Sequence, residues 1–157
     1  MPTLHAHLHA RMASAYRRLQ ESLTGLDPND AAAGTQADWR RYRFGTGLNG
    51  SIEGIVRHLA TWKHAAAAGL HTGNFPDPES VLPPLSTWEG LTNALADGHR
   101  RLANELERLS EADLDRTVTW EGHSMPVHVL LAHMIEHDQY HTGQINLLRQ
   151  QLGHDLE

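Results

Sequence analysis

Hydrophobic residues recur at helical spacing in four segments of the chain, and these segments predict four long helices. Residues 4–23 and residues 51–70 each place an apolar side chain every three or four positions. A third stripe of leucines follows the sequence STWE and continues to Leu109. The fourth segment begins after Ser124 and reaches about Leu152, before Gly153. Stripes of this kind face a shared core, so the pattern predicts helices that pack on one another.

Capping residues indicate where these helices begin. Asn49 and Ser51 are both candidate N-caps for the second helix. Ser86 followed by Glu89 predicts a capping box at the start of the third helix, and Pro126 suits the first turn of the fourth. The sequence therefore predicts defined starts for three of the four helices.

The segments between the helices carry residues that interrupt helices. Residues 26–48 show no sustained period, which predicts a loop with at most one short turn of structure. Residues 71–85 contain four prolines and predict a second long loop. RTVTW at 116–120 alternates and is a candidate short extended piece. Four helices with two long connections favour an all-α four-helix bundle, a single domain over residues 1–157.

Three histidines occur four residues apart in the fourth segment, in HMIEHDQYHTGQI. A step of four residues is about one helical turn, so His133, His137 and His141 lie along one side of the helix. His137 and His141 fall within the apolar face, whereas His133 falls at its margin. Buried imidazoles need polar partners, and a shared metal ion would satisfy both at once.

The second helix supplies a third candidate ligand, His58, beside Trp62 at the edge of its apolar stripe. This pattern alone does not distinguish a metal site from a set of hydrogen-bonded core histidines. Asp138 and Gln144 lie near the proposed ligands on the helical wheel and are candidate partners for them. The alternative for Asp138 is an ion pair with Arg149.

The composition and the net charge argue against several classes of function. The net charge of −6 argues against a nucleic-acid surface. No apolar run has the length of a membrane span, there is no signal-peptide core, and cysteine is absent, so we expect a cytoplasmic protein without disulfides. His5, His7 and His9 are expected to belong to the ordinary first helix.

Two segments carry a family resemblance. HMIEHDQYHTGQINLLRQQLG resembles the last helix of the DinB/YfiT-like metal-binding superfamily, and SIEGIVRHLATWK resembles its second helix. The resemblance implies an up-down-down-up four-helix bundle, a homodimer, and zinc or nickel bound by His58, His137 and His141, with His133 not a ligand. A basic residue often follows the last histidine in the family, and here Thr142 takes that position.

These features lead to a working hypothesis and a rival. Three neutral imidazoles on a divalent ion leave a position open, as catalytic zinc sites do. We expect a metal-dependent enzyme that activates water or a low-molecular-weight thiol against a small-molecule substrate. The resemblance implies the thiol, which some relatives use. The reaction would then be hydrolysis, or a thiol-dependent transfer or isomerisation. The rival is a metal-binding or metal-stabilised helical protein without catalysis.

Overall fold

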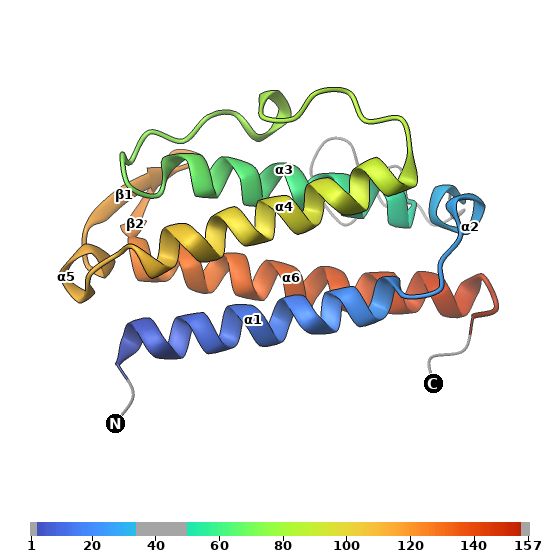
Figure 1. Ribbon diagram of the computed structural model, residues 1–157, viewed down its shortest axis with the longest axis horizontal. Coiled ribbons are helices and arrows are strands. Elements are labelled where there is room, and N and C mark those ends of the chain that lie inside the picture. Colours follow the sequence, from blue (N-terminus) through green and yellow to red (C-terminus); the bar gives the residue numbers. More distant parts are fainter. Residues whose placement is uncertain (1–2, 34–49, 155–157) are drawn as a thin grey trace.

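Four long helices make up most of the computed structural model, which describes residues 3–33 and 50–154. They are α1 (Leu4–Leu23), α3 (Ile52–Gly69), α4 (Trp88–Glu107) and α6 (Val127–Gln151). Figure 1 shows the four helices side by side along the long axis of the molecule. The predicted all-α bundle is confirmed. Within the described ranges, no helix combines the length and the apolar character needed to cross a membrane.

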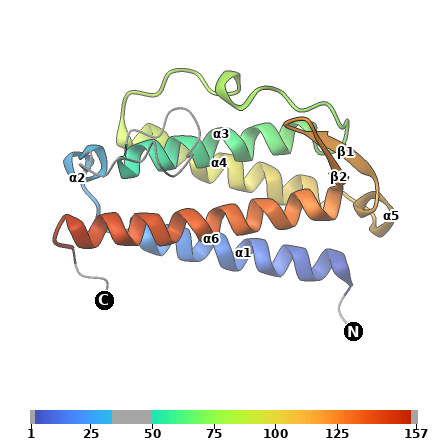
Figure 2. The same ribbon diagram turned by 180° about the vertical axis from the view of Figure 1, so that it is seen from behind.

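The helices run up, down, down and up (Figure 1). The connection between α3 and α4 returns along the whole length of the bundle before α4 begins, so α3 and α4 point the same way. α3 packs mainly against α4, and α1 mainly against α6. Figure 2 shows from behind how α6 lies between α1 and α3, so that α6 faces α3 across the bundle.

Short elements fill the connections. They are α2 (Pro28–Ala32), the 3-10 turn η2 (Pro78–Ser80), α5 (Glu111–Leu114), β1 (Thr117–Trp120) and β2 (His123–Pro126). β1 confirms the extended piece predicted at 116–120, and it pairs with β2 in an antiparallel hairpin. Glu121 and Gly122 link the strands with φ of 47° and 81°. Both values are positive, as the tight turn of a two-residue hairpin requires.

Several predicted helix ends differ from the structure. Ser51 caps α3 as expected, because its side chain accepts a hydrogen bond from the Gly54 N–H. The capping box at Ser86 is wrong: α4 begins one residue later, and Thr87 is its cap. The start predicted for the last helix is also wrong, because Ser124 belongs to β2 and Pro126 precedes the helix as its N-cap.

The first predicted loop is partly helical. Asp27 caps α2 through hydrogen bonds from the N–H groups of Asn29 and Asp30, and Pro28 occupies the first turn. Asp27 and Pro28 therefore start a short helix soon after α1 ends at Leu23. Residues 34–48 of this predicted loop, and Asn49 as a candidate cap, lie outside the described residues.

The buried apolar side chains form two clusters along the bundle axis. The first cluster lies toward the hairpin and includes Leu8, Leu102, Val118 and Leu130. The second cluster lies toward the other end and includes Leu19, Ile55, Leu95 and Leu148. On α6, His137 and His141 lie between members of these two clusters, whereas His58 of α3 lies beside Ile55 and Leu59 of the second.

Candidate metal centre

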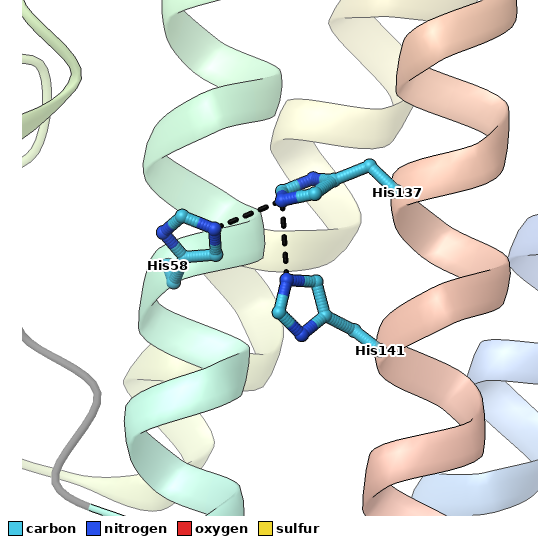
Figure 3. A group of neighbouring side chains, drawn as sticks. All are labelled: His58, His137 and His141. Atoms are coloured by element: carbon cyan, nitrogen blue, oxygen red, sulfur yellow. Dashed lines mark hydrogen bonds between the residues drawn. The ribbon is translucent and has the colours of Figure 1, made fainter. Parts of the chain in front are cut away.

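Two facing helices position the three histidines of the candidate site. His58 lies on α3, and His137 and His141 lie one turn apart on α6. Figure 3 shows the three side chains pointing toward one another in the space between the two helices. His141 is buried, and the other two are partly exposed. Residues that are 79 positions apart in the sequence therefore meet because α3 faces α6.

The ring nitrogens converge closely. His137 Nε2 lies 2.9 Å from His58 Nε2 and 3.1 Å from His141 Nε2. One ring nitrogen from each of the three side chains lies within 4.8 Å of the other two. The rings meet at steep angles of 69°, 70° and 83°, so none of the three pairs is stacked face to face.

This donor set fits a divalent ion. Nitrogen ligands at zinc distances in a tetrahedral arrangement lie about 3.3 Å apart, close to the two shorter separations seen here. Hydrogen bonds alone cannot satisfy all of these nitrogen atoms well. His137 Nε2 lies beside two other ring nitrogens but carries at most one hydrogen. A cation would accept the lone pairs of all three rings.

Gln144 fixes the orientation of one ring. The Nδ1–H of His141 donates to Gln144 Oε1 at 2.6 Å. A neutral imidazole carries a single N–H, so the opposite nitrogen, Nε2, presents a lone pair toward His137. This is the arrangement in which an outer hydrogen bond aligns a metal-binding imidazole.

Burial keeps the three rings neutral. Desolvation lowers the pKa of His58 to about 4 and that of His141 to about 4. The pKa of His137 falls further, to about 2, because burial is reinforced by the neighbouring His141, His58 and Lys63. All three side chains therefore present lone pairs near neutral pH, as metal binding requires.

The other predicted residues take different places around the triad of His58, His137 and His141. The Trp62 ring lies 4.8 Å from the His137 ring and 5.1 Å from the His58 ring, centroid to centroid. His133 is exposed, and its ring is 6.5 Å from that of His137. Trp62 therefore forms one wall of the site, whereas the structure leaves His133 outside the group of converging nitrogens.

Aromatic rings connect the second long loop to this wall. Phe75 contacts Trp120 edge-to-face at a centroid distance of 5.0 Å, and Trp120 contacts Trp62 in the same way at 5.5 Å. Gly69 makes room for this packing, because a Cβ at that position would lie 2.2 Å from a ring atom of Phe75. The loop after α3 and the hairpin therefore support Trp62 from behind.

Asp138 does not take either of the roles predicted for it. Its Oδ2 accepts a hydrogen bond from Lys63 Nζ at 2.7 Å, and both side chains are almost fully buried. Arg149 instead donates to the carbonyl oxygens of Ser22 and Thr24. The predicted Asp138–Arg149 pair is wrong, and the carboxylate faces Lys63 and not a triad imidazole. Burial raises the pKa of Asp138, whereas the Lys63 ammonium opposes that shift.

Sequence reasoning missed Lys63. It lies four residues after Leu59 and three before Ala66, within the apolar stripe of α3. A lysine at such a position is rarely buried without an anionic partner. That mismatch was the available signal, because it marks Lys63 as a buried cation that needs an anionic partner, without identifying the partner.

Sequence relatives carry names that refer to metal. A protein of Geobacillus kaustophilus named "Putative metal-dependent hydrolase" is 34% identical over 117 residues, which are 66% of this chain and 66% of the relative. A protein of Geobacillus thermodenitrificans with the same descriptive name is 40% identical over 117 residues, with the same 66% shares of both chains. The chain thus spans about two thirds of the length of these relatives.

Fold and family comparisons agree with each other. The crystal structure of a DinB-like protein from Bacillus subtilis superposes with a TM-score of 0.64, covering 97% of this chain and 92% of that chain at 19% identity. The family model of the DinB superfamily matches residues 11–145, a range that contains both helices of the triad. The chain belongs to the DinB superfamily.

Proposed function

We propose that this protein is a metal-dependent enzyme in which His58, His137 and His141 hold one divalent ion, with zinc or nickel as the metal. The observation that carries the proposal is the convergence of three ring nitrogens at 2.9 and 3.1 Å from two facing helices. Imidazole nitrogen suits both metals. The metal-dependent names of the two Geobacillus relatives support the same assignment.

The composition of the site favours catalysis over a purely structural ion. Three neutral ligands leave the ion its full double charge and at least one open position. When bound, such an ion lowers the pKa of water or of a thiol, so that the reactive anion exists near neutral pH. Two of the three histidines are partly exposed, which leaves a route for a small molecule.

The chain's own residues would prepare this chemistry. Gln144 holds the His141 ring by its Nδ1–H, so that Nε2 stays free. The Trp62 ring, which lies against His58 and His137, would give a bound substrate an apolar surface to rest on. The buried setting would exclude bulk water and strengthen electrostatic interactions within the site.

Water is the favoured activated group, because the two relatives are named as hydrolases. A thiol-dependent transferase or isomerase is the second form of the same proposal. The two forms differ in one measurable requirement, since only the second needs an added thiol.

The test is reconstitution. The protein is stripped with a chelator, reloaded with zinc or nickel, and assayed on activated esters and amides with and without a panel of low-molecular-weight thiols. We expect turnover that depends on metal, is lost in His137→Ala and is kept in His7→Ala, an exposed histidine on α1. Metal binding through the triad without turnover on any substrate would support the non-catalytic rival.

A further inference from the structure

A layer of polar side chains crosses the bundle beside the triad, and each long helix contributes one residue to it. The members are Tyr16 of α1, Lys63 of α3, His99 of α4 and Asp138 of α6. Lys63 and Asp138 are joined at 2.7 Å, with side-chain exposures of 3% and 1%. The Lys63 ammonium lies 5.7 Å from the centre of the Tyr16 ring, which stacks on His99 at 3.7 Å.

This layer lies where the two apolar clusters meet. On α1, Tyr16 itself belongs to the second cluster and directly follows Ala15 of the first. On α3, Leu59 and Ala60 belong to the second cluster and Ala65 to the first, with Lys63 between them. On α6, the first cluster ends at Ile135 and the second resumes at Ile145. Asp138 lies in this interval together with the two triad histidines of α6. The apolar face of α6 is thus interrupted where His137 and His141 lie.

The triad also spans a sparsely packed interface. α3 makes most of its contacts with α4, and α6 makes most of its contacts with α1, whereas α3 and α6 contact each other far less. Apolar contacts carry little directional information, so side-chain packing alone tolerates small shifts of one helix along another. His58 must nevertheless stay within about 0.5 Å of its position for three nitrogens to share one ion.

A buried ion pair supplies the missing constraint. Separating Lys63 from Asp138 would leave two uncompensated charges in the core, which is strongly unfavourable. Sliding α3 along α6, or rotating it against α6, therefore becomes energetically unfavourable. The pair itself nevertheless adds little net stability compared with an apolar pair. Asp138 directly follows His137, so fixing its carboxylate also fixes the backbone that carries His137.

We propose that the Lys63–Asp138 pair is a positioning device, which locks α3 against α6 so that His58 stays in reach of His137 and His141. The inference rests on the proposed metal site. It assigns the pair a role in metal geometry that is separable from its contribution to folding.

The test uses cobalt(II), whose visible absorption reports ligand geometry. The double variant Lys63→Met/Asp138→Leu replaces the pair with apolar side chains of similar volume. We expect the metal-free variant to melt within a few degrees of the parent or higher. Its cobalt affinity should fall about 10- to 100-fold, with shifted absorption bands, a loss of the size seen when hydrogen-bonded partners of metal ligands are removed. Parent affinity together with the parent spectrum would overturn the proposal.

A matched control distinguishes an effect on the position of the metal ligands from an effect on the stability of the protein. Arg149 is a second buried cation, on α6 two turns beyond His141, and it holds the end of α1 by donating to two carbonyl oxygens. Arg149→Met should lower the melting temperature and leave the cobalt spectrum and affinity unchanged. If the apolar pair fails to fold, Asp138→Asn is compared with Arg149→Met. Weaker cobalt binding in Asp138→Asn supports the lock, and equal binding overturns it.

One further variant distinguishes the two proposals. If His137→Ala binds cobalt as the parent does, the metal site itself is wrong and the lock falls with it. If His137→Ala loses the ion while Lys63→Met/Asp138→Leu keeps it unchanged, the site stands and only the lock is refuted.

Discussion

Both ring nitrogens of His141 have partners, and this decides what the ring offers to a metal. Nδ1–H donates to Gln144, and Nε2 faces His137. In the absence of Gln144, the ring could place its hydrogen on Nε2, which would turn the ligand nitrogen into a donor. The glutamine therefore contributes to metal affinity without touching the metal.

The first prediction concerns Gln144→Ala. Metal affinity should fall by about 10-fold or more, because the tautomer and the ring orientation are no longer held. Competition with a chromophoric chelator measures the dissociation constant. Gln139→Ala is the control, since Gln139 is an exposed glutamine of the same helix. Equal dissociation constants for the two variants would show that Gln144 does not orient the ligand.

Neutral imidazoles in the core also determine the response to acid. Burial lowers the pKa of His58 to about 4 and that of His141 to about 4, below the value of about 6.5 in an unfolded chain. As pH falls below about 7, the unfolded chain takes up protons that the folded chain does not. Each such histidine then costs about 1.4 kcal/mol of folding free energy per pH unit until it protonates in the folded state.

The second prediction follows from this loss of folding free energy at low pH. The metal-free protein should lose stability from pH ~7 down to pH ~4, while remaining helical at neutral pH. The metal-loaded protein should melt higher at pH ~7.5, and its advantage should shrink on acidification as protons displace the ion. Calorimetry with and without chelator measures the gap. A constant gap down to pH ~4.5, with metal retained, would instead require carboxylate ligands.

At the scale of elements, stripes of apolar residues were enough to predict the four long helices. Their ends were less predictable, because two adjacent capping residues compete at Ser86 and Thr87 and only packing selects between them. β2 was missed, since the sequence HSMP has no apolar alternation and forms a strand only through its pairing with β1. Gly122 after Glu121 was the one local signal for that turn.

The candidate site was likewise predictable from the sequence only in part. The triad was predicted from helical spacing and from family resemblance, because its ligands occupy diagnostic positions in two segments. The Lys63–Asp138 pair was not predicted, because it depends on how two helices lie relative to each other. Helical wheels of α3 and α6 drawn separately contain no information about which residues meet across the interface.

The third prediction concerns the loop after α3. Gly69→Ala should destabilise the protein by about 1–3 kcal/mol, because the new Cβ would collide with the Phe75 ring and its backbone. Gly143→Ala is the matched control: it lies within α6, nothing lies within 4 Å of its Cβ position, and it should stabilise by up to about 1 kcal/mol. Urea denaturation measures both, and equal signs would contradict this account of the loop.

At the scale of the whole molecule, the bundle brings the triad together near the level where the two apolar clusters meet. The up-down-down-up order makes α3 and α6 antiparallel neighbours, which brings His58 opposite His137 and His141 (Figures 1 and 3). The order of the helices was predicted by resemblance, because apolar stripes do not determine which helix lies beside which.

The fourth prediction is the homodimer, which family resemblance implies and which stays a prediction. Tyr140 and Leu147 are among the exposed large side chains, and both lie on α6. A second chain covering them would remove apolar surface from water. Light scattering at micromolar concentration should give twice the mass of one chain, and the mass of a single chain would remove the prediction.

The most direct test of the central claim is elemental analysis of protein purified without a histidine-affinity step. The account predicts one divalent ion per chain in the parent. It predicts a large loss of metal in His58→Ala, His137→Ala and His141→Ala, and a smaller loss in His133→Ala, whose ring stands outside the converging nitrogens. An equal loss in His133→Ala and His137→Ala would contradict it.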